Sequence, residues 1–224
     1  MNPPGTARVR SASRLKASLP LLWLLAIPAV NVFYGILNHG RGGSVGSLMT
    51  DLDNQIPFVP LFIIPYLIWY PFIIAMFIVF FLKNRTVYYR SLIALCAGLL
   101  VCYLIYALFQ TTVPRPELAS DGWLNRLVTF VYATDAPYNC FPSIHVLTSY
   151  IVMKASYSCR LKPMAQTAVS LTAWSIIVST LFVKQHAILD LAGAVLLAEA
   201  LMAVMKLISS ERKQQRKEPA AHDL

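Results

Sequence analysis

The chain has 224 residues, a net charge of +9 and a mean hydropathy of +0.59; 57% of its residues are hydrophobic and only 13% are charged. This composition excludes an ordinary soluble domain, in which about a quarter of the residues are charged. The basic residues lie between apolar runs and at the two ends, with no patch interleaved with aromatic residues, so no nucleic-acid partner is expected.

The first apolar run, residues 19–37, follows a polar and basic segment, residues 1–18, that is expected to be disordered. Together they imitate a signal peptide, but no small-residue cleavage site follows, and the run is long enough to span a membrane. We therefore interpret it as a helix. A polar, glycine-rich loop that includes Asp53 occupies residues 38–57.

Five more apolar runs are predicted to form membrane helices, because each approaches the roughly 20 residues that a span needs; they cover residues 58–82, 91–113, 142–158, 164–183 and 187–208. The long loop at 114–141 is expected to carry a short amphipathic helix near 121–133. The charged tail, 209–224, is expected to be disordered. The sequence thus predicts an all-α polytopic membrane protein, with one six-span helical bundle at 19–208 and no internal repeat.

Basic residues divide unequally between the two sides of such a bundle. One side receives both ends of the chain and the loops at 83–90 and 154–163, with 15 of the 19 Lys and Arg. The other side holds four, namely Arg41, Arg115, Arg126 and Lys184. The positive-inside rule places the richer side in the cytoplasm. We expect a multi-pass protein, in the plasma membrane, with both termini cytoplasmic and any site on the poorer side extracytoplasmic.

Two of the four histidines stand at the starts of apolar runs on that poorer side. His186 and Asp190 are four residues apart, which places them on one face of a helix. Asp190 can accept a hydrogen bond from one ring nitrogen of His186, fix its tautomer, and leave the other nitrogen free as nucleophile or base. The alternative is a structural His–Asp pair that caps the start of the helix.

The second histidine lies in Pro142-Ser143-Ile144-His145, at the start of the fourth run. The unpaired N–H groups of a first helical turn, with the Ser143 hydroxyl, make an anion site. His145 on the same turn can give a proton to a leaving oxygen. Arg115, between two prolines after the third run, can grip phosphate oxygens bidentately. The alternative for Arg115 is an anchor for lipid headgroups.

An Arg-Pro after one span, a Pro-Ser-x-His opening the next and a His-x-x-x-Asp opening a later one resemble the type 2 phosphatidic acid phosphatase superfamily. The resemblance implies a helical phosphatidic acid phosphatase-like core and a mechanism without metal or cofactor. His186 would attack phosphorus and form a phosphohistidine, Asp190 would orient His186, and His145 would protonate the leaving alcohol. The phosphoryl oxygens would be held by Arg115, Ser143 and nearby backbone N–H groups.

The resemblance covers residues 110–193, and two basic residues of the family pattern are absent. Leu108 stands where the first motif has a lysine, and Ser179 and Thr180 stand where the third motif has Ser-Arg. Lys184 lies four residues after Thr180, and we expect it to replace the lost arginine as a phosphate ligand. The alternative for Lys184 is a lysine that snorkels from the end of a span.

The expected function is hydrolysis of a phosphate monoester or diphosphate of a membrane lipid. Residues 54–60 and 180–186 look like the inositol phosphorylceramide synthase branch, so a phospho-headgroup transferase of the inositol phosphorylceramide or sphingomyelin synthase type is the alternative; only the acceptor of the phosphoryl group differs. A transporter or scaffold is a second alternative, although transporters usually have internal repeats and ionisable groups near mid-membrane. The expected partners are the bilayer and a lipid phosphate substrate.

The four cysteines show no metal-ligand spacing, so no metal site is expected. Cys140, beside the first histidine motif, is interpreted as a neutral packing residue, because free cysteine packs readily as a small apolar side chain.

Overall fold

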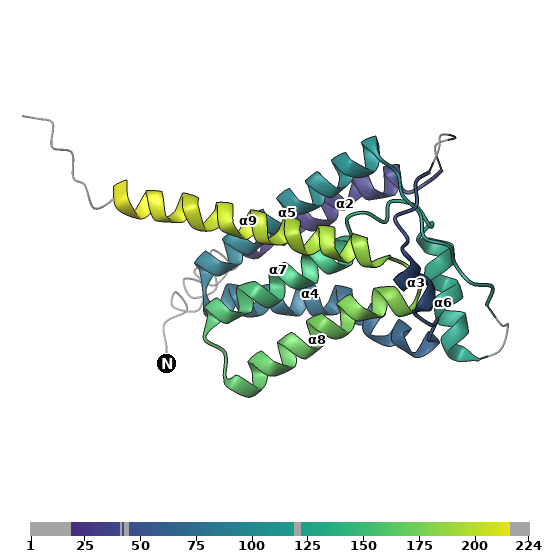
Figure 1. Cartoon of the computed structure of the whole chain (residues 1–224). Coiled ribbons are helices and arrows are strands. Elements are labelled where there is room, and N and C mark those ends of the chain that lie inside the picture. Colours follow the sequence, from purple (N-terminus) through teal and green to yellow (C-terminus); the bar gives the residue numbers. More distant parts are fainter. Residues whose placement is uncertain (1–18, 41, 43–44, 119–121, 216–224) are drawn as a thin grey trace, which may run out of the picture.

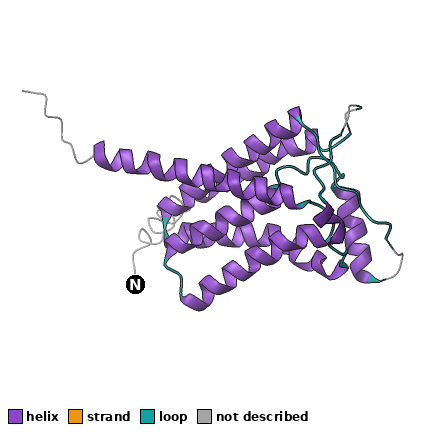
Figure 2. Cartoon of the chain, in the orientation of Figure 1, coloured by secondary structure: helices purple, strands orange, loops and turns teal. Residues whose placement is uncertain are grey.

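The computed structural model describes four stretches of the chain, residues 19–40, 42, 45–118 and 122–215. The prediction of an all-α protein is confirmed: the described residues form helices joined by loops, without a strand (Figure 2). One isolated parallel bridge joins Gly46 to Thr111. The predicted disorder of residues 1–18, and of the last part of the charged tail, 216–224, falls outside the described residues.

The α-helices and short 3-10 helices (η) follow one another along the chain as η1 (Leu19–Leu25), α2 (Ala26–Leu37), α3 (Asp51–Gln55), η2 (Pro60–Phe62), α4 (Ile63–Lys83), α5 (Arg85–Leu108), α6 (Trp123–Thr134), α7 (Ile144–Ser156), η3 (Tyr157–Cys159), α8 (Pro163–Phe182) and α9 (Ile188–Gln215). Figure 1 shows the long helices gathered in one bundle, with the end of α9 reaching beyond it and the short α3 and α6 at the opposite end.

Five helical stretches are long and apolar enough to cross a membrane, namely Leu19–Leu37, Pro60–Lys83, Arg85–Leu108, Pro163–Phe182 and Ile188–Ile208. Large apolar side chains remain exposed on these helices; Leu104 and Leu196, for example, are 60% and 71% exposed. Monomeric soluble proteins rarely leave large contiguous apolar surfaces uncovered. The fold is therefore compatible with a multi-pass membrane protein.

Helix α7 lies inside the bundle and packs against α4, α5, α8 and α9. Eleven of its 13 residues are buried. Thirteen residues rise about 20 Å, less than the roughly 30 Å of a bilayer core. The helix is shorter than the predicted run at 142–158 because Ser143 caps its start and the chain enters η3 at its end. Helix α7 is thus buried by four neighbouring helices, although it is shorter than a bilayer core is thick.

Two long helices have other bounds than hydropathy indicated. Helix α5 ends at Leu108, five residues before the predicted end of its run at 113. Helix α5 starts before the apolar run because the Asn84 side chain accepts hydrogen bonds from the backbone N–H groups of Thr86 and Val87. Helix α9 continues through the first residues of the charged tail to Gln215. Caps and charged side chains let a helix run past the edge of its apolar stretch.

The loops that flank the long helices contain two short helices at the same end of the bundle (Figure 1). Helix α6 confirms the amphipathic helix predicted near 121–133. Helix α3 was not predicted. It is held by a capping box in which Thr50 and Asp53 satisfy each other's backbone N–H groups.

Candidate active site

The turn between α8 and α9 presents His186. Helix α8 ends at Phe182, and Lys184 takes the left-handed conformation, with φ 52°, that reverses the chain after a helix. The Thr180 carbonyl then accepts hydrogen bonds from the N–H groups of Gln185, at 2.9 Å, and His186, at 3.2 Å. Both side chains are buried, with 5% and 7% exposed. The backbone of the turn therefore holds His186 in place before any side-chain contact is considered.

The structure brings His145 and His186 into direct contact. Nε2 of His186 lies 3.4 Å from Nδ1 of His145, and Nδ1 of His186 lies 3.0 Å from the Cys140 carbonyl oxygen. A carbonyl can only accept, so Nδ1 of His186 carries a proton, and in the neutral ring Nε2 keeps a lone pair. The nitrogen suited to nucleophilic attack thus faces His145.

Asp190 has two contacts at the start of α9. Its Oδ2 accepts a hydrogen bond from the Ala187 N–H at 2.8 Å and lies 3.5 Å from Nδ1 of His186. The first contact caps the helix, as the structural alternative for the His–Asp pair required. The second is longer than an ordinary hydrogen bond, so the Cys140 carbonyl is the nearer partner of the ring. The Asp190 carboxyl group therefore lies beside a ring whose tautomer is already set by the Cys140 carbonyl.

Ser143 joins the two histidine motifs through its backbone. Its N–H donates to the Asp190 carbonyl at 3.2 Å, and its Oγ accepts from the Val146 N–H at 3.3 Å as the N-cap of α7. Gly193 permits this close approach: a Cβ there would lie 2.4 Å from Cε2 of Phe141. The starts of α7 and α9 therefore lie close together, as predicted. One of the free N–H groups in the first turn of α7, that of Val146, already donates to the Ser143 hydroxyl.

An aromatic wall from α4 covers His145. The His145 ring lies 4.1 Å from the Trp69 ring and 4.7 Å from the Tyr66 ring, centroid to centroid. Trp69 is itself fixed, because its Nε1 donates to Oγ1 of Thr148, one turn after His145, at 2.8 Å. Sequence reasoning missed both aromatic residues; their spacing of three along an apolar helix was the available signal.

Arg115 reaches the turn that carries His186. Its Nη1 donates to the Tyr132 carbonyl at 3.0 Å, and its Nη2 donates to the Asp135 carbonyl at 2.6 Å and to Oε1 of Gln185 at 2.9 Å. The guanidinium also lies 4.3 Å from the centroid of the Tyr132 ring. Arg115 thus ties the loop after α6 to the residue before His186, and two of its nitrogens are engaged with oxygen acceptors.

Three buried N–H donors near the histidines lack an acceptor in the described part of the chain, namely Nε of Arg115, Nε2 of Gln185 and Nδ2 of Asn139. The amide orientations follow from donor partners, since Oε1 of Gln185 accepts from Arg115 and Oδ1 of Asn139 accepts from Gln110. A buried donor without a partner costs about 1–3 kcal/mol. Each of the three could donate to an acceptor oxygen placed beside it.

Lys184 has different contacts from those expected of a phosphate ligand. Its ammonium donates to the backbone carbonyls of Asp53, at 3.1 Å, and Ile56, at 2.5 Å. These contacts fasten α3 to the turn before His186. The direct phosphate contact stays a prediction. Leu108, at the place of the family's lysine, is 80% exposed on the outside of the bundle.

Asp53 is a positioning residue that sequence reasoning missed. Its Oδ1 accepts from the Ile188 N–H at 2.7 Å, and its Oδ2 accepts from the Thr50 N–H and hydroxyl at 2.8 Å and 2.7 Å. Burial alone would raise the pKa of this carboxyl, but the hydrogen bonds from Thr50 and Ile188, with the charge of Lys184, outweigh it and lower the pKa. Asp53 therefore holds the first N–H of α9 as a carboxylate.

A cysteine, a histidine and a carboxylate meet at the same place. The possible ligand atoms of Cys140, His186 and Asp190 lie within 4.8 Å of one another. Metal binding needs the thiolate, whereas burial, followed by the charges of Asp190 and Asp135, raises the pKa of the Cys140 thiol. Nδ1 of His186 and Oδ2 of Asp190 also have protein partners already. The donor set fits a neutral thiol packed beside a histidine better than a metal centre.

Comparison of the chain with models of known protein families finds no match, and comparison with curated proteins finds none either.

Proposed function

We propose that the protein is an integral membrane enzyme that hydrolyses a phosphate monoester or diphosphate of a membrane lipid through a phosphohistidine on His186. One observation carries the proposal: Nε2 of His186 keeps its lone pair, because Nδ1 is bonded to a carbonyl, and it faces a second histidine at 3.4 Å. The three unpartnered donors around this pair support a phosphoryl group as the ligand.

In the first step Nε2 of His186 forms a bond to phosphorus while the bond from phosphorus to the lipid oxygen breaks. His145 gives its proton to that oxygen, and the lipid alcohol leaves. In the second step water attacks phosphorus, His145 takes a proton from it, and the P–N bond breaks to release phosphate. His186 returns to its starting state with Nδ1 still held by Cys140.

Access to the pair requires movement of His145. A phosphoryl group on Nε2 of His186 occupies the direction in which His145 now lies, and 3.4 Å between the nitrogens leaves no room for it. His145 therefore turns aside when substrate enters. The His145 ring packs against Tyr66 and Trp69, so these two side chains limit the directions in which it can turn.

The proposal includes the topology predicted from charge. Six crossings, with α7 as an inner one, place both termini on the cytoplasmic side of the plasma membrane and the histidine pair on the other side. The support is the division of 15 of the 19 basic residues to one side and the burial of α7 among four helices. Cysteine substitution at Lys162 and Trp123, followed by labelling of whole cells with an impermeant maleimide, tests it: only the variant at Trp123 should react.

The activity test compares the purified full chain with His186→Ala. Phosphate release is measured from phosphatidic acid, phosphatidylglycerol phosphate and a polyprenyl diphosphate. The matched control is His39→Ala, which removes an exposed histidine outside the site. We expect release by the wild type and the control and none by His186→Ala. A wild type inactive on all three lipids would remove the proposal.

A headgroup transferase is the second candidate, and burial of the site favours it. His145 and His186 are only 5% and 7% exposed, and exclusion of water favours transfer to a lipid alcohol over hydrolysis. Incubation with a lipid labelled in its headgroup phosphate separates the two functions. Free labelled phosphate supports hydrolysis, and a new labelled phospholipid supports transfer. If neither free labelled phosphate nor a new labelled phospholipid is formed, the remaining alternative, a membrane protein without enzymatic activity, is supported.

A further inference from the structure

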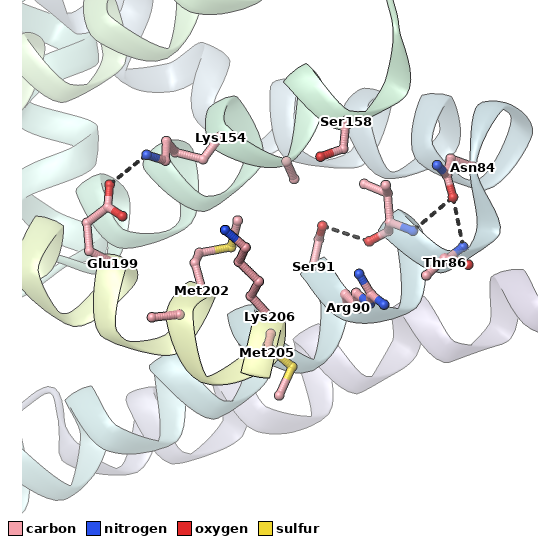
Figure 3. A pocket seen from close by; sticks show the side chains of 13 residues that line it. Asn84, Thr86, Arg90, Ser91, Lys154, Ser158, Glu199, Met202, Met205 and Lys206 are labelled. Atoms are coloured by element: carbon pink, nitrogen blue, oxygen red, sulfur yellow. Dashed lines mark hydrogen bonds and ion pairs between the residues drawn. The ribbon is translucent and has the colours of Figure 1, made fainter. Parts of the chain in front are cut away.

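A cavity lies toward the other end of α7 from His145. It has a volume of about 650 Å³ and lies between the start of α5, the end of α7 and the second half of α9 (Figure 3). Lys154, which lines it, follows His145 by nine residues, or about 14 Å along the helix. None of the residues assigned to the histidine site lines this cavity.

Three basic side chains from three different helices line the cavity, namely Arg90 of α5, Lys154 of α7 and Lys206 of α9. Figure 3 shows them around it, with the Lys154 ammonium turned toward Glu199. Glu199 is the sole carboxylate among the lining residues; it pairs with Lys154 at 2.9 Å and accepts a hydrogen bond from the Tyr150 hydroxyl. The lining therefore carries two positive charges more than it can balance.

The cavity also has an apolar side. Met202 and Met205 of α9 line it together with Val87 of α5, while Ser158 and Thr86 add hydroxyl groups. A ligand that matches both parts carries a phosphate and is joined to an apolar body. Basic pockets between membrane helices on the cytoplasmic side bind the headgroups of anionic lipids for the same reason.

The positive-inside rule accounts for the sign of these charges but not for their position around one cavity. Lys83 and Lys162 belong to the same basic side and do not line the cavity. We propose that the cavity between α5, α7 and α9 binds the phosphate-bearing headgroup of an anionic lipid from the leaflet on the basic side. This site is separate from the proposed active site, and its occupation does not depend on any catalytic activity.

The test titrates the purified full chain in detergent with phosphatidylglycerol or phosphatidylcholine and counts bound lipid by native mass spectrometry. A cation near a membrane surface contributes about fivefold to binding, so Arg90→Gln with Lys206→Gln should weaken phosphatidylglycerol binding about thirtyfold. Lys83→Gln with Lys162→Gln makes the same change of charge outside the cavity and should leave binding within about twofold. Glu199→Gln frees Lys154 and should tighten binding about fivefold.

Glu199→Gln keeps the proposal testable if the double variant fails to fold, because it predicts a gain. Equal binding of phosphatidylglycerol and phosphatidylcholine by the wild type would overturn the proposal. Equal weakening in the two double variants would also overturn it, since it would show a general surface charge effect. A third arm adds glycerol 3-phosphate: failure to displace phosphatidylglycerol supports a lipid ligand, and displacement at similar concentration would reassign the cavity to a free phosphate ester.

Discussion

Replacement of Asp53 by asparagine should destabilise the protein and disturb the start of α9. The carboxylate accepts two hydrogen bonds from Thr50 on one oxygen and one from Ile188 on the other. An asparagine has one acceptor oxygen, so it keeps either the Thr50 bonds or the Ile188 bond and turns an N–H₂ group toward the remaining donors. Each hydrogen bond to a charged group contributes about 1.5–3 kcal/mol. We expect a loss of about 2–4 kcal/mol in the free energy of unfolding.

The pH dependence of stability gives this prediction a second readout. The pKa of Asp53 is lowered in the folded protein, whereas an unfolded aspartate titrates near pH 3.9. Its contribution is therefore present above about pH 4 and is lost as the pH falls through the lower folded value. The wild type should lose stability over that window, and the part due to Asp53 should be missing in Asp53→Asn.

The assay is unfolding of the full chain in detergent, followed by circular dichroism as denaturant is added, at pH 7 and along an acid series. Asp51→Asn is the matched control, because Asp51 lies in the same short helix and is exposed. The control should stay within about 0.5 kcal/mol of the wild type. If Asp53→Asn and the Asp51→Asn control have the same free energy of unfolding at every pH, the hydrogen bonds of Asp53 do not fix the start of α9, and the prediction is wrong.

Three further substitutions test other parts of the site. Gly193→Ala forces Phe141 away, because the new Cβ would lie 2.4 Å from its ring; turnover should fall about a hundredfold, whereas Gly35→Ala, with no atom within 4 Å of its Cβ, should match the wild type. Lys184→Gly should be about 1 kcal/mol more stable than Lys184→Ala, because glycine adopts a φ of 52° without strain; wild-type turnover in both would remove the ammonium from the phosphate site. Gln185→Glu puts an acceptor in place of the unpaired amide and should lower kcat/KM about tenfold or more without loss of stability; a fully active variant would show that the amide does not bind substrate.

Much of the fold could be predicted because apolar runs and charges dictate it. The runs at 19–37 and 164–183 match their helices within one residue at each end, since no strong cap competes with the apolar pattern there. Asn84 moves the start of α5 into polar sequence that hydropathy does not mark. The fourth run differs in another respect: its 13-residue helix is buried by its neighbours, and sequence spacing does not show which helix will be surrounded.

The candidate site was predicted unevenly for a similar reason. The prediction that Asp190 lies near His186 is confirmed at 3.5 Å, but the two do not share a helix face, because α9 begins only at Ile188 and His186 lies in the turn before it. The shorter contact to Nδ1 comes from the Cys140 carbonyl, and a pattern of side chains does not indicate backbone contacts. Asp53 lies 135 positions before its partner Ile188. The three-residue spacing of Thr50 and Asp53 was nonetheless a local signal for a capping box.

The burial of α7 also has a consequence for insertion of the chain into the membrane. This helix carries His145, Thr148, Ser149 and Ser156 among its buried residues. The Thr148 and Ser156 hydroxyls donate to carbonyls of α7 itself, whereas the His145 ring contacts Trp69 of α4 and His186 before α9, and α7 alone in lipid would lack these contacts. Helix α7 packs against α4 and α5, which precede it in the chain, and against α8 and α9, which follow it. The histidine pair, with one member on each side of α8 in the chain, is thus completed only when the last helix closes over α7.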